Sequence, residues 1–315
     1  MTTARSAYPG ALLDDDVFAD QWWFVRIYTQ GFDGADPLIG DLLPPVIAEA
    51  RAHGIRRWFY IRYLDDYGPH VRLRVLGRRP VLDHLQRVHR ELEADLGDLM
   101  SARPAEHCFI APVDRRAYEG RSATGVRASI YEPEVAKYGG AVGLGLAEEL
   151  FEFSSDLGLW ACGRLDKGHD RAGLAALLLA DGVAALVGGP HAQVPSRRRV
   201  DADAYWDRHL QWWTAELGRR GPAVRSTMRE RVDERRERVV DSMERVSALP
   251  GVGAWRRRWG TAVDAYLERA RTAGVDRSPQ HLTFHHGHMM LNRLGFLPRE
   301  EAVLGVYARA WADRG

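Results

Sequence analysis

The spacing of apolar residues along this 315-residue chain changes near residue 140, and this change restricts the possible folds more than any other feature. Before residue 140, short runs of aromatic and β-branched residues alternate with two stretches at helical spacing, whereas after it most apolar residues recur every three or four positions. Strands followed by a series of helices are typical of an α+β protein. We therefore expect an N-terminal, mainly antiparallel sheet with flanking helices, followed by a helical half. We interpret residues 1–315 as a single unit, with a sheet-rich part at 17–140 and a mainly helical part at 141–315.

The expected elements follow from these patterns. The expected strands are residues 21–31, 57–63, 70–77, 108–113 and 128–135. The second and third of them are separated by LDDYGP, whose Asp, Gly and Pro are typical of a hairpin connection. Helical spacing predicts helices at 42–50 and 82–96 in the first part, and at 144–159, 171–187, 202–217, 225–246 and 254–273 in the second.

The charge balance argues against a nucleic-acid partner. The chain has 44 basic and 43 acidic residues and a formal net charge of +1, whereas non-specific binding to a polyanion requires a large positive excess or a basic stripe. The basic runs at 197–199 and 229–238 stand next to acidic residues that offset them. All but two of the basic residues, Lys137 and Lys167, are arginines. A GC-rich coding bias explains this excess, and oxyanion recognition is the functional alternative.

Cysteine content and hydropathy predict a soluble, cytoplasmic protein. Cys108 and Cys162 form no CxxC pair, so neither a disulfide framework nor a cysteine-based zinc site is expected. The N-terminal residues lack the apolar run of a signal peptide. The longest apolar stretch, residues 172–189, carries Asp181 near its middle, and this favours a buried helix over a membrane span.

The strand-like segment HVRLRV is the first of three segments that can carry chemistry. In a strand, Arg72 and Arg74 share one face, while Val71, Leu73 and Val75 share the other. Two guanidinium groups roughly 7 Å apart on a rigid strand can bind a carboxylate or phosphate. A solvated polar strand face explains the same pattern, and Arg62 on the paired strand fits either interpretation.

The second segment, YEPEVAKYGG at 131–140, places Tyr131, Glu134 and Lys137 next to two glycines that permit a tight turn or close backbone approach. An ordinary junction between a strand and a turn would look the same.

The third segment is HLTFHHGHMMLNRLG at 281–295. In a helix, His281, His285, His288 and Asn292 lie along one stripe. The pattern is not HExxH and no acidic residue stands close in sequence, so we expect no metal site there. One histidine acting as general acid or base is the functional interpretation, and histidines scattered over core and surface are the alternative. The sequence has no dinucleotide-binding glycine motif, P-loop or GxSxG, and we expect no cofactor.

Taken together and in this order, the segments resemble a known family. The runs QWWFVRIY, WFYIRYLDDYGPHVRLRV, YEPEVAKYGG and HMMLNRLG are similar to the C-terminal elimination domain of lantibiotic dehydratases and to stand-alone thiopeptide-type bacteriocin biosynthesis proteins. The resemblance covers nearly the whole chain. The same superfamily includes the thiopeptide pyridine synthases.

The resemblance implies an enzyme that matures a ribosomally made precursor peptide. A separate glutamyl-tRNA-dependent dehydratase would glutamylate Ser or Thr, and this protein would then eliminate glutamate to leave dehydroalanine or dehydrobutyrine. Arg72 and Arg74 match the arginines of the family's HLRLR strand, and His288 matches the histidine of its HMxxNRLG helix, so these three are the expected catalytic residues. Lys137 stands where an arginine is often found. The expected substrate-binding residues are Arg62, Tyr131, Glu134, Lys137, His285 and Asn292.

Two alternatives remain open. A pyridine synthase would join two dehydroalanines in a formal [4+2] cycloaddition and release the leader peptide. The length of the chain, near that of a bare elimination domain, together with the arginine pair and the histidine, favours elimination. A non-catalytic subunit could instead present the precursor to partner enzymes, with the aromatic-rich run QWWFVRIY as an edge strand that accepts an extended leader peptide.

Overall fold

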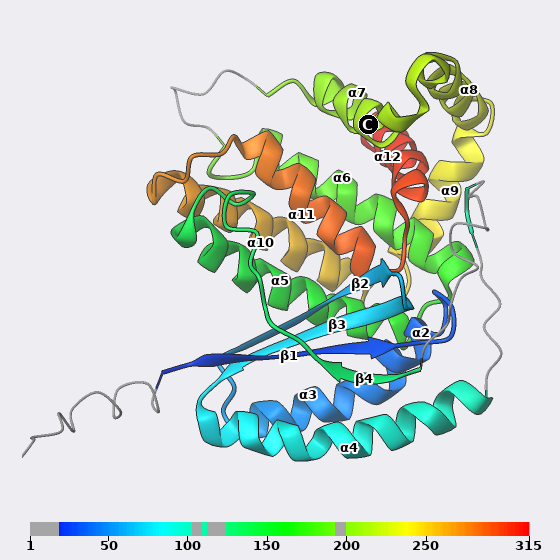
Figure 1. The fold of residues 1–315 in the computed structure, drawn as a ribbon. Helices are drawn as coiled ribbons and strands as arrows, with labels where there is room; N and C mark the ends of the chain where they lie inside the picture. Colours follow the sequence, from blue (N-terminus) through cyan, green and yellow to red (C-terminus); the bar gives the residue numbers. More distant parts are fainter. Residues whose placement is uncertain (1–18, 103–108, 112–123, 193–199, 315) are drawn as a thin grey trace, which may run out of the picture.

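The computed structural model describes residues 19–102, 109–111, 124–192 and 200–314. Its sheet has four antiparallel strands in the order β2-β3-β1-β4 (Figure 1). The strands are β1 (Gln21–Tyr28), β2 (Arg57–Asp65), β3 (Gly68–Gly77) and β4 (Gly125–Ala128). The rest of the described chain is mostly helical, and the α+β expectation is confirmed.

The three strands that the segment patterns placed at 21–31, 57–63 and 70–77 are present, with β2 and β3 forming the expected hairpin. The strand predicted at 128–135 is wrong. β4 ends at Ala128, and the chain then leaves the sheet, because Pro133 and the turn before Gly140 do not extend a ladder. Of the strand predicted at 108–113, residues 109–111 are not in a strand, and the remainder lies outside the described residues.

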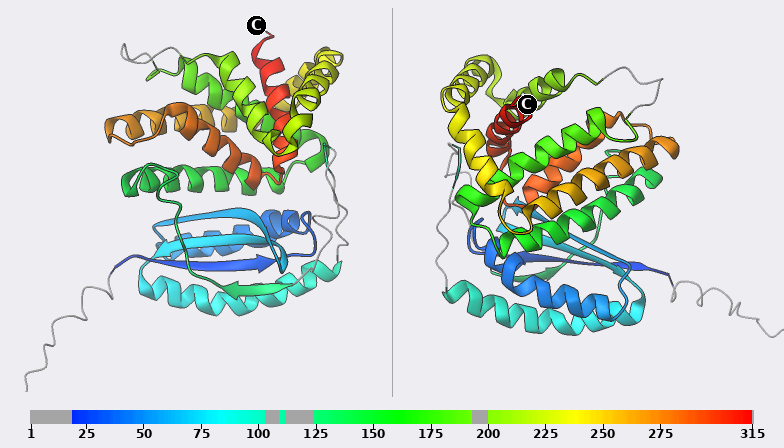
Figure 2. Two further views of the ribbon diagram at one scale, coloured as in Figure 1. Left: turned by 45° about the horizontal axis from the view of Figure 1, so that its top comes forward. Right: turned by 180° about the vertical axis from the view of Figure 1, so that it is seen from behind.

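One face of the sheet is covered by α3 (Leu43–Ala52) and α4 (Arg79–Ala102), which follow the short helix α2 (Ala35–Pro37) and a π-helical turn at Leu38–Leu42 (Figures 1 and 2). Alternate strand residues point to this face, as the period of two requires. They form a core with the apolar sides of α3 and α4; its members include Val25, Ile27, Val71, Leu73, Val75, Leu43, Ile47 and Leu85. Arg72 and Arg74 therefore face the other way, toward the helical half.

The helical half lies on the opposite face of the sheet (Figures 1 and 2). Its helices are α5 (Ala141–Cys162), α6 (Ala172–Gly188), α7 (Ala202–Trp213), α8 (Gly221–Asp233), α9 (Arg236–Ser247), α10 (Val252–Thr272), α11 (Pro279–Arg293) and α12 (Pro298–Ala312). A π-helical turn at Lys167–Arg171 precedes α6, and a 3₁₀ turn at Ala215–Arg220 precedes α8. α5 and α11 contact β2; α9, α10 and α12 pack against α6; and α7 and α8 pack against α12.

The segment Lys167–Gly188, which includes α6, is long and apolar enough to cross a bilayer, but 72% of its most apolar window is buried inside the protein. Its Asp181 receives two hydrogen bonds of 2.7 and 2.8 Å from Arg256 of α10. The carboxylate is thus paired within the helical half, and the prediction of a buried helix is confirmed.

Two helical predictions differ from the structure. The single helix expected at 225–246 is interrupted at Arg235, whose φ of −119° is not helical, because α8 packs on α7 while α9 turns to pack on α6. α12 was not expected at all. It begins at Pro298, and the Glu300 side chain accepts a 2.9 Å hydrogen bond from the Leu297 N–H.

The β2 edge of the sheet is covered by side chains of α5 and α11. On β2, Ser155 of α5 accepts a 3.1 Å bond from the Tyr60 N–H. The Asn292 amide pairs with both backbone groups of Arg62, accepting from its N–H at 2.8 Å and donating to its carbonyl at 2.9 Å.

β1 lies between β3 and β4, so QWWFVRIY is a central strand. Residues 25–28 are paired on both sides, so the predicted role as an edge that accepts a leader strand is wrong for that half, while residues 21–24 pair only with β3 among the described strands.

Candidate active site

A pocket of about 460 Å³ opens between the sheet, the segment that follows β4, and α11. Eight of the nine predicted site residues line it: Arg62, Arg72, Arg74, Tyr131, Glu134, Lys137, His288 and Asn292. His285 is not among the lining residues. The three sequence segments singled out above therefore meet at one place, although they are separated by more than 200 positions in the chain.

Arg74 is the most unusual residue of the pocket. Its side chain is buried, and its guanidinium lies 4.6, 5.4 and 4.9 Å from the ring centroids of Phe24, Phe59 and Tyr131. Among the described residues it has no hydrogen bond and no ion-pair partner. Burial, reinforced by the charge of Arg72, lowers the pKa of Arg74 to about 10. A buried cation held only by aromatic faces is suited to binding an anion that enters the pocket.

Arg72 lies two positions away on β3 and is half-buried. Its Nε donates to Nε2 of His70 at 3.2 Å, and its guanidinium lies 3.4 Å from the ring centroid of Tyr63. His70 donates from Nδ1 to the Gly68 carbonyl at 3.1 Å, which leaves Nε2 free to accept from Arg72. Burial lowers the pKa of His70, which keeps the ring neutral. His70 was missed in the sequence, although its same-face position two residues before Arg72 could have shown it.

Tyr131 connects the pocket to a second carboxylate. Its hydroxyl donates to Glu148 at 2.9 Å, and its ring packs edge-on against Trp22 and Phe59. Burial, and then the neighbouring Glu148 charge, raises the pKa of Tyr131 above its ordinary value, so the phenol stays protonated. Glu148 also lies 3.5 Å from Arg57, and it orients the Tyr131 ring beside Arg74.

Glu134 and Lys137 lie at the rim of the pocket. Their side chains form a 3.1 Å ion pair, and the Glu134 side chain is 65% accessible. Such an exposed pair contributes little to stability, so the Lys137 ammonium can leave Glu134 for another carboxylate at small cost. The lysine provides one compact charge where an arginine would provide a bidentate fork.

His288 has an acidic partner that the sequence did not reveal. Its Nδ1 lies 2.8 Å from Oε1 of Glu301, a fully buried residue of α12. Burial raises the pKa of Glu301, and His288 counteracts this shift. With Nδ1–H directed at the carboxylate, Nε2 remains to exchange a proton, as in other histidine–carboxylate pairs. No acidic residue stands close to the histidines in sequence, but the fold brings Glu301 of α12 to His288.

Arg62 and Asn292 line the pocket but are occupied by structural contacts. The pairing of Arg62 with Val71 turns the Arg62 side chain to the face opposite Arg72. There it binds Asp36 at 2.6 Å and the Arg293 carbonyl at 3.1 Å. The Asn292 side-chain amide is hydrogen-bonded to the backbone of Arg62 at the edge of β2. These contacts give both residues a positioning role in the walls of the pocket.

The histidine stripe of α11 is divided among separate environments. His281 Nε2 lies 3.0 Å from the Lys137 carbonyl, and the His285 ring packs 4.3 Å from that of His281. Burial lowers the pKa of His285 to about 3, so this ring is neutral and acts as a packing residue. In the part of the chain that the structure describes, His281, His285 and His288 do not bring three donor atoms together.

The site thus places two arginines, Arg72 and Arg74, in the same pocket as His288, which is hydrogen-bonded to Glu301. This combination is suited to reactions that remove a proton while a negative charge develops nearby.

Comparison with known proteins places this geometry in context. Residues 22–311 match the family described as lantibiotic biosynthesis dehydratase C-term. No curated protein matches the sequence significantly.

Three solved structures share the fold. The pyridine synthase TbtD from thiomuracin biosynthesis is 20% identical with a TM-score of 0.66, over 93% of this chain and 98% of that one. TsrL is 18% identical with a TM-score of 0.62, over 93% and 95%. The tRNA-dependent lantibiotic dehydratase MibB from Microbispora sp. 107891 is 22% identical with a TM-score of 0.58. There the match covers 99% of this chain but only 29% of MibB.

Proposed function

The chain belongs to the lantibiotic biosynthesis dehydratase C-terminal family, and on this premise we propose that it eliminates glutamate from glutamylated Ser and Thr residues of a precursor peptide. The observation that carries the proposal is the buried guanidinium of Arg74, which has no carboxylate partner among the described residues and stands beside Arg72 in the pocket. A glutamyl group brings the carboxylate that this pair lacks.

β-Elimination requires one proton transfer and one bond cleavage. The base takes the Cα proton of the esterified residue, the electron pair forms the Cα=Cβ double bond, and the bond from Cβ to the ester oxygen breaks. Glutamate leaves with the electron pair of that bond as a carboxylate. His288, oriented by Glu301, is the proposed base, and the imidazolium formed is stabilised by the adjacent carboxylate.

The arginines offset the charge that develops on the departing glutamate. Arg74 is desolvated, so its attraction for an anion is stronger than that of an exposed arginine. Lys137 at the rim is proposed to hold the peptide or the glutamyl group as it enters. Arg62, through Asp36 and α11, keeps the walls of the pocket in place.

We propose that a separate glutamyl-tRNA-dependent protein supplies the glutamylated peptide. MibB is described as tRNA-dependent, and the present chain aligns with 29% of it. The partners proposed are therefore the precursor peptide and this glutamylating enzyme.

A pyridine synthase is the second candidate. The specific observation in its favour is the match to TbtD, which extends over 98% of that chain and 93% of this one. In that reaction the arginines would assist loss of the leader peptide rather than loss of glutamate.

The test offers the purified protein a glutamylated precursor peptide and follows loss of glutamic acid by mass spectrometry. Elimination should fall at least about a hundredfold in Arg74→Ala and His288→Ala, since each removes a group that acts in the transition state. The matched control is Arg258→Ala, because Arg258 also lies over two aromatic rings but is on α10, outside the pocket. Full activity in both pocket variants would refute the assignment.

The same peptide chemistry separates the alternatives. A fully dehydrated, azole-bearing precursor should remain unchanged if the protein is an elimination enzyme, whereas a synthase would yield a macrocycle and a free leader. Tight binding of every precursor form without any change of mass would indicate a presenting subunit instead.

A further inference from the structure

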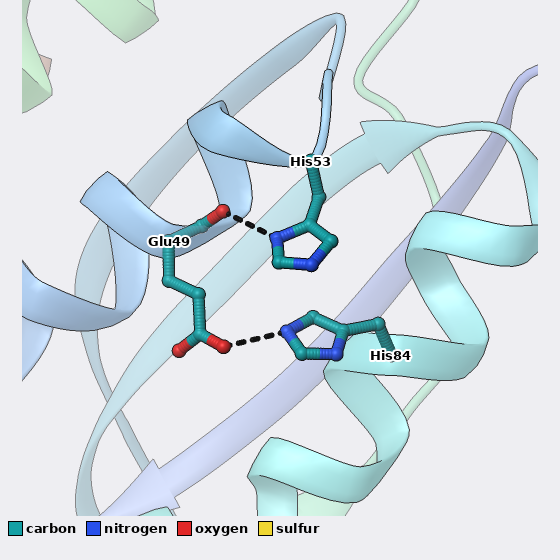
Figure 3. A group of neighbouring side chains, drawn as sticks. All are labelled: Glu49, His53 and His84. Carbon is teal, nitrogen blue, oxygen red and sulfur yellow. Dashed lines mark hydrogen bonds and ion pairs between the residues drawn. The ribbon is translucent and has the colours of Figure 1, made fainter.

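A second cluster of chemically active side chains lies on the far side of the sheet from the pocket. Glu49 is on α3, His53 follows the last residue of α3, and His84 is on the neighbouring helix α4 (Figure 3). One donor atom from each of the three lies within 4.8 Å of the others. We propose that these residues bind a divalent transition-metal cation, with zinc, cobalt and nickel as the matching class, and that the ion ties α3 to α4.

The choice of cation follows from the donors. Two imidazole nitrogens and one carboxylate oxygen are ligands that zinc and its neighbours accept readily. Magnesium and calcium prefer sites built entirely from oxygen and are disfavoured here. Three protein ligands leave the fourth tetrahedral position to a water molecule.

The ring of His53 is already held in the orientation that a ligand needs. Its Nδ1 lies 2.9 Å from the backbone carbonyl of Glu49. A carbonyl can only accept, so Nδ1 carries the proton and Nε2 of the neutral ring has its lone pair free. Metal-bound histidines commonly donate their second N–H in this way, which fixes both tautomer and ring plane.

His84 and Glu49 supply the other two donors. Nε2 of His84 lies 2.7 Å from Oε1 of Glu49, and the two atoms face each other directly (Figure 3). In the metal-free protein a proton lies between them, and the cation replaces it. At Zn–N and Zn–O lengths near 2.0–2.1 Å, two tetrahedral ligand atoms stand roughly 3.3 Å apart, so this pair has to open by only about half an ångström.

The rings of His53 and His84 are stacked, with centroids 4.0 Å apart and an interplanar angle of 17°. For both lone pairs to converge on one ion, the rings must rotate out of this stack. The site permits such rotation, because the side chain of Glu49 is 46% exposed and His53 is also exposed.

Arg87 places a positive charge close to the proposed metal site, where it opposes binding of a cation. Its Nη2 lies 3.4 Å from Nδ1 of His84, as a donor to an unprotonated nitrogen. Once the metal occupies Nε2, the neutral His84 ring carries its proton on Nδ1, and this contact has to break. Arg87 is exposed, so its side chain can move into solvent at small cost.

The site is independent of the proposed elimination chemistry, because α3 and α4 cover the face of the sheet opposite Arg72 and Arg74 (Figure 2). The sequence did not reveal it. Glu49 and His53 have helical spacing, but His84 follows after an intervening hairpin, and only the packing of α4 against α3 brings it near.

The test titrates zinc chloride, and separately cobalt chloride, into chelator-treated protein at neutral pH. We expect one zinc per chain by calorimetry, a cobalt spectrum with visible d–d bands of a tetrahedral site, and a rise in unfolding temperature of about 3–4 °C at a hundredfold excess over Kd. Either His53→Ala or His84→Ala should weaken binding at least about tenfold and remove the thermal shift.

The matched control is His191→Ala. His191 also pairs with a carboxylate, at 2.6 Å from Asp264, but has no third donor nearby among the described residues. Zinc binding should be unchanged in this variant. Binding that survives loss of both His53 and His84, a stoichiometry that falls in the His191 variant, or no binding to the wild-type protein would each overturn the proposal.

Discussion

Replacing Arg74 by methionine should make the protein more stable and inactive at once. Arg74 is buried, and its pKa is lowered to about 10 because burial disfavours the charged form. At 1.36 kcal/mol per pKa unit, the buried charge costs roughly 3 kcal/mol of folding free energy at neutral pH. The sign follows from the direction of the shift: a base whose pKa is lower in the folded state destabilises that state fully below about pH 10, and the penalty disappears as the pH rises from there to the ordinary pKa of arginine.

Methionine fills a similar volume without the charge, but it loses the attraction between the guanidinium and the rings of Phe24, Phe59 and Tyr131. We therefore expect a net gain of about 1–2 kcal/mol, which for a chain of this length raises the unfolding temperature by roughly 2–3 °C. Elimination of glutamate should be lost, because the pocket no longer attracts a carboxylate.

The measurement is calorimetric unfolding of wild type and Arg74→Met, with the peptide assay run on the same samples. Arg171→Met is the matched control: Arg171 is equally buried, but its Nη2 lies 2.5 Å from Asp36, and breaking that pair should cost about 3 kcal/mol. If Arg74→Met is less stable than wild type by 1 kcal/mol or more, the reasoning is refuted, since the charge of Arg74 would then stabilise the folded state.

Three further predictions test other parts of the structure. Glu301→Gln should lower kcat of elimination by about 10–100-fold with KM nearly unchanged, because glutamine cannot stabilise the His288 imidazolium; steady-state kinetics on the glutamylated peptide would measure this. Asn292→Ala should cost about 2–3 kcal/mol in urea unfolding, as two backbone groups of Arg62 lose their partners; normal stability with a raised KM would instead place Asn292 in substrate binding. Arg62 and Arg171 lower the pKa of Asp36 to about 2, against the effect of burial. Asp36 should therefore add about 2 kcal/mol to the free energy of unfolding above pH 4, and this contribution should disappear as the pH falls to 2. This acid-dependent loss should be absent in Asp36→Asn.

Much of the candidate site could be found from local patterns. The period of two in HVRLRV placed Arg72 and Arg74 on one face, and the structure places that face toward the pocket. The change of spacing near residue 140 gave the fold class. These predictions succeeded because they depend on neighbours within a few positions of the chain.

Other features depended on contacts that no local pattern encodes. Arg62 was grouped with Arg72 and Arg74, but the register of the hairpin pairs it with Val71 and sends it to the other face, where Asp36 holds it. The sequence predicts Asn292 as a substrate contact, whereas in the structure its amide is hydrogen-bonded to the Arg62 backbone at the edge of β2. A shift of one residue in register or a helix crossing an edge changes the surroundings of a side chain without changing its sequence.

By itself, the sequence determined the first three strands, most of the helices and which side chains share a face, because periodicity and turn chemistry are local. Only the tertiary structure decided which charges are paired. Folding brought Asp36 to Arg62, Glu301 to His288 and His84 to Glu49, while it left Arg74 among aromatic rings. In a buried pocket the energy of a charge depends chiefly on its nearest partner, and for these residues that partner is either distant in the sequence or missing.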